Sequence, residues 1–447
     1  MDTPRPPSSS APIAVDMQAT TSPQEEEEVH AMAEAFRKAI HEQIKTRGKT
    51  PEPDVINAAL ATTSPKLSFG RSPAASPRIS NTTVPSTTTT ITTTTTTAPS
   101  DNTSEFTSRP PSGSSDPATQ LIVDDEDAAS GDAASNPAAF MAEHQPASMT
   151  SSVRDHMFEG GLRYHAYRAG KYAFPNDETE QNRDDMKHTM TLMLCNWQYF
   201  YAPVEEALER GAEVLDLGTG TGIWVIELGD RYPQSTFTGI DLSPIQPTLV
   251  PENVHFFVDD FEEEWVDPDN KYDYIHLRYA LHSVHDVDAL LARVYRHLKP
   301  GGYFEIQELC VLPSCDDGSL TPETPYALRD YLDFLCQGLR MRGCDAHAIF
   351  SIQERMAAAG FTDIKKVVHK APLGVWPSEK RLKVCGLFMK TALMDGLRGI
   401  SRRPLTALGW TPLQIEMFLV EVRRAVADTN KHVWFPLHVV YGRKPPA

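Results

Sequence analysis

The chain has 447 residues, with 42 Lys and Arg against 60 Asp and Glu, and a formal net charge of -18 at pH 7. A charge of this sign argues against a nucleic-acid-binding protein, which normally presents a basic face to the phosphates. No apolar stretch is long enough for a transmembrane helix, so we expect no membrane partner. The six cysteines form no C-x-x-C pair, and we expect no metal. We find no secretory signal before them and therefore expect reduced thiols in the cytoplasm and/or the nucleus.

Residues 1–150 differ in composition from the rest of the chain, because Ser, Thr, Pro, Ala and acidic residues dominate them. Such a segment cannot bury enough apolar surface to become ordered, and we predict a disordered arm. Within it, residues 24–47 follow a capping box and predict an amphipathic helix. Its apolar face is formed by Val29, Met32, Phe36, Ile40 and Ile44. We expect this helix to dock on the folded domain, to bind a regulatory protein partner, or to form only transiently.

A glycine-rich loop follows a short apolar strand, residues 213–217, within the folded part of the chain at residues 151–447. The strand carries Asp216, and a helix over residues 223–231 follows the loop. The loop residues are Gly218, Thr219, Gly220, Thr221 and Gly222. Glycine permits a tight turn and a close approach to a ligand, and the helix N-terminus offers free N–H groups. This predicts a nucleotide-like cofactor, although a dinucleotide fingerprint would need its third glycine at residue 223.

Two further strands end in acidic residues. Residues 235–240 lead to Asp241 and Leu242, and residues 254–258 lead to an acidic pair. In a doubly wound sheet the ligand lies across the carboxyl ends of the strands, so Asp241 is expected to accept both ribose hydroxyls. Strands at residues 272–277 and 303–307 follow, separated by a helix over residues 287–298 and the turn Lys299–Gly302.

This order of features resembles the class I S-adenosylmethionine-dependent methyltransferases. The shared patterns are D-x-G-x-G-x-G from Asp216 and L-K-P-G-G from Leu298. The resemblance implies an α/β, Rossmann-like fold with a doubly wound, seven-stranded, mostly parallel sheet, and S-adenosylmethionine as cofactor. It also implies that the acidic pair accepts the adenine amino group, with Asp260 preferred over Asp259, and that Phe261 or Trp265 covers the adenine face.

Several segments resemble one branch of these enzymes, the fungal LaeA-type methyltransferases. They are residues 164–172, 175–188, 259–265, 275–278 and 434–442. The family includes velvet-associated regulators of secondary metabolism and enzymes that methylate small metabolites. In the resembling segments, Asn176 or Asp177 is expected to cap a helix. Tyr164 and Tyr167 are candidates to close over the site, and Arg168 or Arg278 to pair with the methionine carboxylate.

Three helical segments, residues 322–340, 378–398 and 411–427, are expected to form a lid and a substrate pocket. His276 and His282 are weak candidates for a general base, as is His285. No N-P-P-Y-type motif follows the fourth strand, which argues against methylation of a nucleic-acid base. Two functions remain open: methyl transfer to an O, N or C atom of a small metabolite, or a regulatory subunit that acts through protein complexes.

Overall fold

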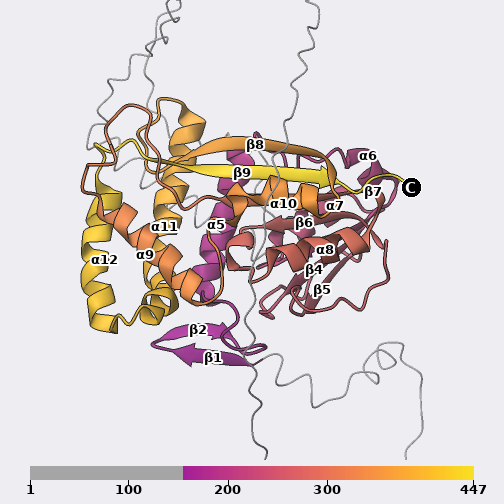
Figure 1. The fold of residues 1–447 in the computed structure, drawn as a ribbon, viewed down its shortest axis with the longest axis horizontal. Helices are drawn as coiled ribbons and strands as arrows, with labels where there is room; N and C mark the ends of the chain where they lie inside the picture. Colours follow the sequence, from indigo (N-terminus) through magenta and orange to yellow (C-terminus); the bar gives the residue numbers. More distant parts are fainter. Residues whose placement is uncertain (1–154) are drawn as a thin grey trace, which may run out of the picture. The chain divides into compact units, whose positions relative to one another are not determined.

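The computed structural model describes residues 155–447. The predicted arm at residues 1–150 and its helix at residues 24–47 lie outside the described residues. Seven strands form the main sheet in the order β5-β4-β3-β6-β7-β9-β8, and Figure 1 shows it with helices around it. The strands are β3 (Glu213–Leu217), β4 (Thr236–Asp241), β5 (Val254–Val258), β6 (Tyr272–Arg278), β7 (Leu298–Leu309), β8 (Thr362–Pro372) and β9 (Trp434–Arg443).

The sheet is parallel from β5 to β7, and only β9 runs antiparallel to both of its neighbours. This confirms the predicted seven-stranded, mostly parallel, doubly wound sheet. The helices are α5 (Glu178–Leu194), α6 (Glu205–Arg210), α7 (Ile223–Arg231), α8 (Val287–His297), α9 (Ala327–Met341), α10 (Ile352–Ala358), α11 (Lys380–Ala407) and α12 (Pro412–Ala427). Two 3-10 turns, η1 (Leu281–Ser283) and η2 (Ala348–Phe350), and a hairpin of β1 (His156–Glu159) and β2 (Leu162–His165) complete the described part.

Alternation along the buried strands places apolar side chains on both faces of the sheet. Val214 packs in a cluster with Trp224 of α7, whereas its neighbour Leu215 packs with Leu290 of α8 on the opposite face. Because both faces are covered, the central strands are buried. Because these strands are parallel, their carboxyl ends form one edge of the sheet. That edge carries the glycine loop and the acidic residues at the ends of β4 and β5.

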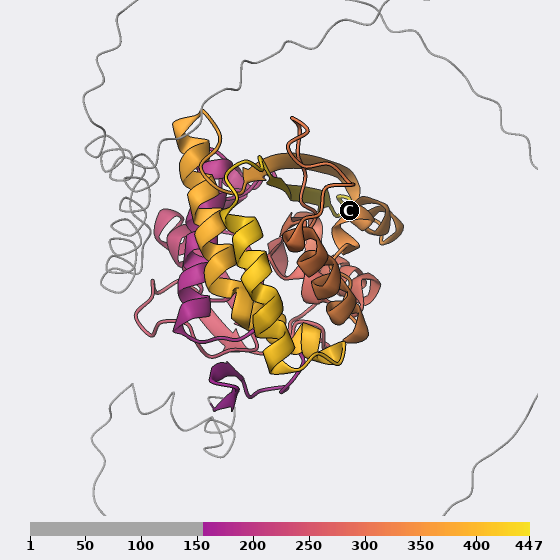
Figure 2. The same cartoon turned by 90° about the vertical axis from the view of Figure 1, so that its left-hand side faces the viewer.

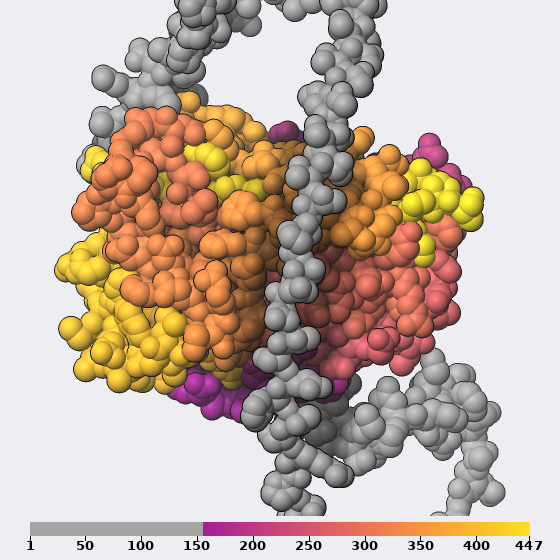
Figure 3. Space-filling model, viewed as in Figure 1, coloured from indigo at the N-terminus to yellow at the C-terminus, as the bar shows by residue number. Residues whose placement is uncertain are grey.

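A third apolar cluster lies among α5, α9, α11 and α12. Figure 2 shows α5, α11 and α12 side by side, and in Figure 3 the orange and yellow surface of α9, α11 and α12 lies beside the pink surface of the sheet and α8. The helices α9 and α11 cross so closely at Gly338 that a Cβ there would lie 2.2 Å from the Pro404 carbonyl oxygen. We call residues 178–194, 327–341, 380–407 and 412–427 the helical half, and the seven-stranded sheet with α6, α7, α8 and α10 the sheet half.

Some boundaries differ from the predictions. The helix predicted over residues 378–398 continues to Ala407 through Pro404, whose side chain is buried. Packing against α9 therefore outweighs the cost of an interior proline, about 3 kcal/mol. The predicted turn at Lys299–Gly302 lies inside β7, because the N–H of Gly301 donates to Lys444 O and the N–H of Lys444 donates to Gly302 O, each at 2.9 Å.

Within residues 155–447, no helix combines the length and apolarity that a membrane crossing requires. The same part of the chain contains no group of three or more His, Cys, Asp or Glu side chains arranged to hold a metal ion. Of the six cysteines, all of them in this part, five are buried and Cys315 is partly exposed.

Candidate active site

The glycine loop is fixed at the carboxyl edge by backbone hydrogen bonds. The N–H groups of Gly218 and Thr219 both donate to Ile240 O of β4, at 2.9 and 3.0 Å. Gly220 has φ +59°, and a Cβ there would lie 3.7 Å from a carboxylate oxygen of Asp184, in the space that faces α5. Gly222 has another role, since a Cβ there would lie 2.3 Å from the Phe256 ring. Glycine is favoured at 220 by its positive φ and is required at 222 by the packing of Phe256.

Asp241 lies next to this loop at the end of β4. One of its carboxylate oxygens accepts from Gly220 N at 2.9 Å and the other from Ser243 N at 2.8 Å. Burial raises the pKa of Asp241 to about 6, and these two N–H donors limit the rise. Each oxygen retains a lone pair for a further donor, so this carboxylate suits a vicinal diol.

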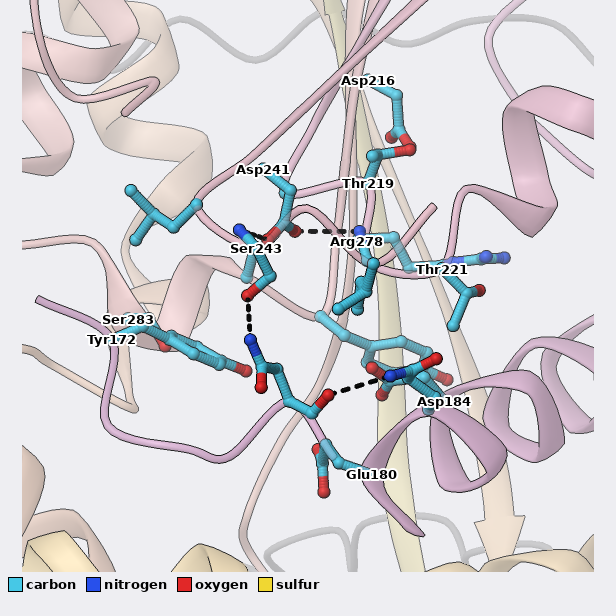
Figure 4. A pocket seen from close by; sticks show the side chains of 18 of the residues that line it. Tyr172, Glu180, Asp184, Asp216, Thr219, Thr221, Asp241, Ser243, Arg278 and Ser283 are labelled. Atoms are coloured by element: carbon cyan, nitrogen blue, oxygen red, sulfur yellow. Dashed lines mark hydrogen bonds between the residues drawn. The ribbon is translucent and has the colours of Figure 1, made fainter. Parts of the chain in front are cut away.

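A cavity of about 1160 Å³, its open mouth included, borders the loop and Asp241. Of the sequence-predicted cofactor residues, those that line it are Asp216, Gly218, Thr219, Gly220, Asp241, Leu242, Asp260, Phe261 and Arg278. The predicted residues Gly222 and Asp259 do not line it. Figure 4 shows Glu180 and Asp184 of α5 across the cavity from Asp241 and Thr219.

The acidic pair after β5 divides into two roles. Asp260 is buried, forms an ion pair with Lys171 at 2.9 Å, and accepts from Glu262 N at 3.0 Å. Asp259 instead accepts from the Tyr167 hydroxyl at 3.1 Å. The structure thus places the preferred acid in the cavity and the second choice outside it. Phe261 lines the cavity, whereas Trp265 donates its indole N–H to the Phe261 carbonyl and packs elsewhere.

Only one of the two candidate arginines reaches the cavity. Arg278 lines it and donates to His188 Nδ1 at 2.7 Å, while its Nη1 is buried without a hydrogen-bond partner among the described residues. Arg168 is half exposed and pairs with Glu263 at 2.8 Å. Tyr164, a candidate to close over the site, is fully buried with the Arg403 guanidinium 3.6 Å from its ring centroid.

The residues that α5 and the segment before it contribute were not predicted from the sequence. Lys171 and Tyr172 line the cavity, together with Glu180, Asp184 and Lys187 of α5. These three helical positions recur at four- and three-residue spacing and therefore share one face. Polar residues at that spacing on a helix leading into the glycine strand were a signal that could have found them.

The structure corrects His276 as a candidate base. Its side chain is 0% exposed, its Nδ1 lies 2.8 Å from a carboxylate oxygen of Asp216, and its ring stacks on Trp224 at 3.9 Å. It does not line the cavity beside the glycine loop, nor the second, mainly apolar cavity that adjoins it. Its contact orients Asp216 from the neighbouring strand, since the two residues are paired between β3 and β6. His285 also lies away from the cavities and contacts Glu262 at 3.0 Å.

A second cavity of about 880 Å³, its open mouth included, adjoins the first and shares Tyr172, Lys187 and Tyr279 with it. Its walls are mainly apolar and come largely from α9 and α11. These side chains are Leu332, Leu335, Leu339, Met389, Ala392, Leu393 and Ile400. Two polar side chains, His282 and Glu308, enter the same wall from the carboxyl edge of the sheet.

Two of the three helices that were predicted to form a lid and a substrate pocket wall the second cavity. The helices α9 and α11 wall the second cavity, as residues 322–340 and 378–398 were expected to do. No α12 residue lines it; this helix packs against α9 and α11 through Ile415, Leu419 and Val422. Its apolar spacing arises from that packing, which the spacing alone does not distinguish from a pocket wall.

Comparisons with known proteins agree with this geometry. A protein family described as methyltransferase domain matches residues 186–366. Methyltransferase pytC of Aspergillus terreus is 38% identical over 301 residues, 67% of this chain and 91% of that protein. Secondary metabolism regulator LAE1 of Cochliobolus heterostrophus is 33% identical over 64% of this chain and 94% of that protein. Protein-methionine methyltransferase laeA of Emericella nidulans is 34% identical over 64% of this chain and 76% of that protein.

Proposed function

This chain belongs to the LaeA-type class I S-adenosylmethionine-dependent methyltransferases, and we propose that it methylates a small, largely apolar metabolite of fungal secondary metabolism at an O, N or C atom. The observation that carries the proposal is the second cavity, which is mainly apolar and shares Tyr172, Lys187 and Tyr279 with the cavity of the glycine loop. Two cavities with a common wall allow an acceptor and a cofactor to meet in a fixed orientation.

The residues of the first cavity fit S-adenosylmethionine. Asp241 suits the ribose hydroxyls, and Asp260 suits the adenine amino group, which would share that carboxylate with Lys171. Arg278 has a buried Nη1 without a hydrogen-bond partner among the described residues, and it suits the methionine carboxylate. When bound, the cofactor supplies a methyl group on a positively charged sulfur.

The chain's own contribution to the reaction is alignment and exclusion of water. The apolar side chains of α9 and α11 remove water from around an acceptor, and the packed cluster behind them holds it in one orientation. An activated methyl donor needs little more than this from the protein, unless the acceptor carries a proton that must leave.

Calorimetry with S-adenosylmethionine tests the cofactor assignment. We expect micromolar affinity in the wild type and its loss in Asp241→Ala and Gly220→Val, since the first removes the diol acceptor and the second fills the loop. Asp259→Ala is the matched control, because this neighbouring acid does not line the cavity. Binding that is unaltered in Asp241→Ala contradicts the assignment.

The acceptor class is tested by incubating the full chain with methyl-labelled S-adenosylmethionine and a low-molecular-weight extract of a fungal culture. We expect label in an apolar small molecule for the wild type and none for Asp241→Ala. Label found only on protein would exclude the metabolite proposal. It would favour the second candidate function instead.

That second candidate is a LaeA-like regulatory subunit, cytoplasmic or nuclear, that controls secondary-metabolite genes through protein complexes. The observation that favours it is the similarity to regulators of secondary metabolism at 33% and 34% identity. Affinity purification of the full chain and of residues 151–447 from the same cells tests it. A partner that depends on residues 1–150 supports the regulatory function; the same partners in both samples argue against a role for the arm.

A further inference from the structure

A histidine and a glutamate lie together at the carboxyl edge of the sheet, in the wall of the second cavity. His282 belongs to η1, just after β6, and Glu308 to the end of the neighbouring β7. His282 Nδ1 lies 3.3 Å from Glu308 Oε1, and Glu308 Oε2 accepts from Leu281 N at 2.9 Å. Glu308 is only 3% exposed, so both of its oxygens are held in place. The carboxylate therefore fixes which nitrogen of His282 carries the proton.

The other ring nitrogen of His282 is in a different situation. His282 Nε2 is buried and forms no hydrogen bond with any described residue. The ring stacks on Phe174 at 5.5 Å, and Phe174 also lines the second cavity. A buried polar atom in native structures nearly always has a partner, so an unpartnered nitrogen beside an apolar cavity points to a ligand that supplies one.

The remaining charged groups of this cavity are cations that already have partners. Arg183 contacts Glu180 at 2.8 Å, and Lys187 contacts Asp184 at 2.7 Å. The other titratable side chains in the wall are the hydroxyls of Tyr172, Tyr279 and Tyr331. Glu308 is thus the cavity's single carboxylate among the described residues, and it is occupied. Such a wall disfavours a cationic amine and suits a group that becomes negative.

We propose that His282 is the general base of the reaction, that Glu308 is its positioning residue, and that the acceptor is an apolar molecule with a phenol- or enol-type hydroxyl directed at His282 Nε2. The inference rests on the proposed function, because it assigns the second cavity to the acceptor. It adds the acceptor atom and the route of the proton.

The acceptor O–H bond breaks and its proton moves to His282 Nε2, while the oxygen lone pair forms a bond to the methyl carbon. The methyl–sulfur bond breaks with its electron pair left on sulfur, which gives a methyl ether and a neutral thioether. The positive charge passes to the imidazolium of His282 beside Glu308, and the proton is lost to solvent when the product leaves.

The probe that tests this inference is 4-nitrophenol, because its ionised and neutral forms differ in visible absorbance. The full chain is saturated with S-adenosylhomocysteine and the spectrum of bound probe is recorded one pH unit below the pKa of the free probe. In the wild type we expect the ionised fraction of the bound probe to rise about fivefold over that of the free probe. His282→Gln should bind the probe in its neutral form.

The controls separate a missing base from a damaged fold. Glu308→Gln retains an oxygen for Leu281 N but removes the charge beside His282, and we expect an intermediate ionised fraction. His285→Asn, at a histidine outside both cavities, should behave as the wild type. Calorimetry with S-adenosylmethionine on each variant reports whether the first cavity is intact, so failure of the proposed function appears there and not in the probe spectrum.

A second measurement uses only the wild-type chain and does not depend on whether variants at His282 or Glu308 fold. Nitrogen NMR of the wild-type chain labelled at histidine should contain a ring with its proton on Nδ1, and addition of 4-nitrophenol should shift that ring towards imidazolium. Failure of the wild type to bind the probe, a neutral bound probe, or equal ionisation in His282→Gln with intact cofactor binding would each overturn the inference.

Discussion

The sheet half and the helical half form the walls of their cavities by different means. Around the glycine loop the contacts belong to the backbone: Gly218 N and Thr219 N donate to Ile240 O, and Gly220 N donates to Asp241. In the helical half, apolar side chains of α9 and α11 form the cavity wall. Backbone geometry tolerates few residue types, whereas an apolar wall tolerates many of similar volume. This difference explains why the first region carries a motif and the second does not.

The largest expected effect is a loss of stability at the point where α9 and α11 cross. Gly338→Val places side-chain atoms where the Pro404 carbonyl lies, 2.2 Å from an ideal Cβ. We expect the free energy of unfolding to fall by about 4 kcal/mol, since backbone rather than a flexible side chain must move. Urea denaturation measures it. Gln337→Val, at an exposed neighbouring position of the same helix, is the control and should stay within about 0.5 kcal/mol of the wild type.

The next prediction separates the two regions functionally. Ala392→Trp fills the second cavity from α11 and leaves the glycine loop untouched. We expect methyl transfer to the endogenous acceptor to fall by about 100-fold or more, because the loss of a well-packed acceptor contact costs several kcal/mol. The affinity for S-adenosylmethionine, measured by calorimetry, should stay unchanged. Equal loss of both would mean that the cavities do not act separately.

A third prediction concerns the contact between the regions. Asp185 of α5 accepts from Thr221 of the glycine loop at 2.8 Å, and burial raises its pKa to about 7. The folded state holds this proton more tightly than the unfolded state, so its stabilising contribution is complete at low pH and is lost as pH rises through about 7.

At pH 8 the buried charge of Asp185 therefore opposes folding. Asp185→Asn keeps an oxygen for Thr221 and removes that charge, and we expect it to raise the free energy of unfolding by about 2 kcal/mol at pH 8. At pH 4 the gain should vanish. Denaturation at the two pH values measures this difference, and a gain that is independent of pH would contradict the assigned cause.

The smallest expected effect tests the assignment of Asp241 to the ribose hydroxyls of the cofactor. The pKa of Asp241 is raised to about 6 by burial, and ribose hydroxyls need its carboxylate form. Protonation therefore competes with cofactor binding below pH 6, and we expect affinity about tenfold weaker at pH 5 than at pH 8. Calorimetry across this range measures it. Asp241→Asn should lose the pH dependence along with most of the affinity.

The sequence predicted the sheet half closely because its local signals agree with one another. The strand at residues 254–258 and the helix at residues 223–231 have the predicted bounds. Strand alternation also contained information that was not used. On β6, alternation places His276 on the same face as Tyr274, and both pack with Trp224 of α7. This alternation already indicated that a helix covers His276.

The helical half was predicted less well because packing between distant segments decides it. Nothing local to Pro404 indicates that α11 continues through it, since the packing partner is α9, more than sixty residues earlier in the chain. Likewise Tyr164 lies in a segment that predicted a site residue, but the guanidinium of Arg403 of α11 covers its ring. Choosing His282 over His276 required Glu308, which lies on another strand.

The contact between Gly338 and Pro404 also limits how this protein could diversify. Where two backbones touch, the volume of the second cavity cannot be changed by exchanging side chains at the crossing. Changes of the volume of this cavity are then confined to wall positions away from that crossing. These are Leu332, Leu335, Met389, Ala392 and Leu393. A library restricted to these five positions searches for new acceptors while the frame of the cavity stays constant.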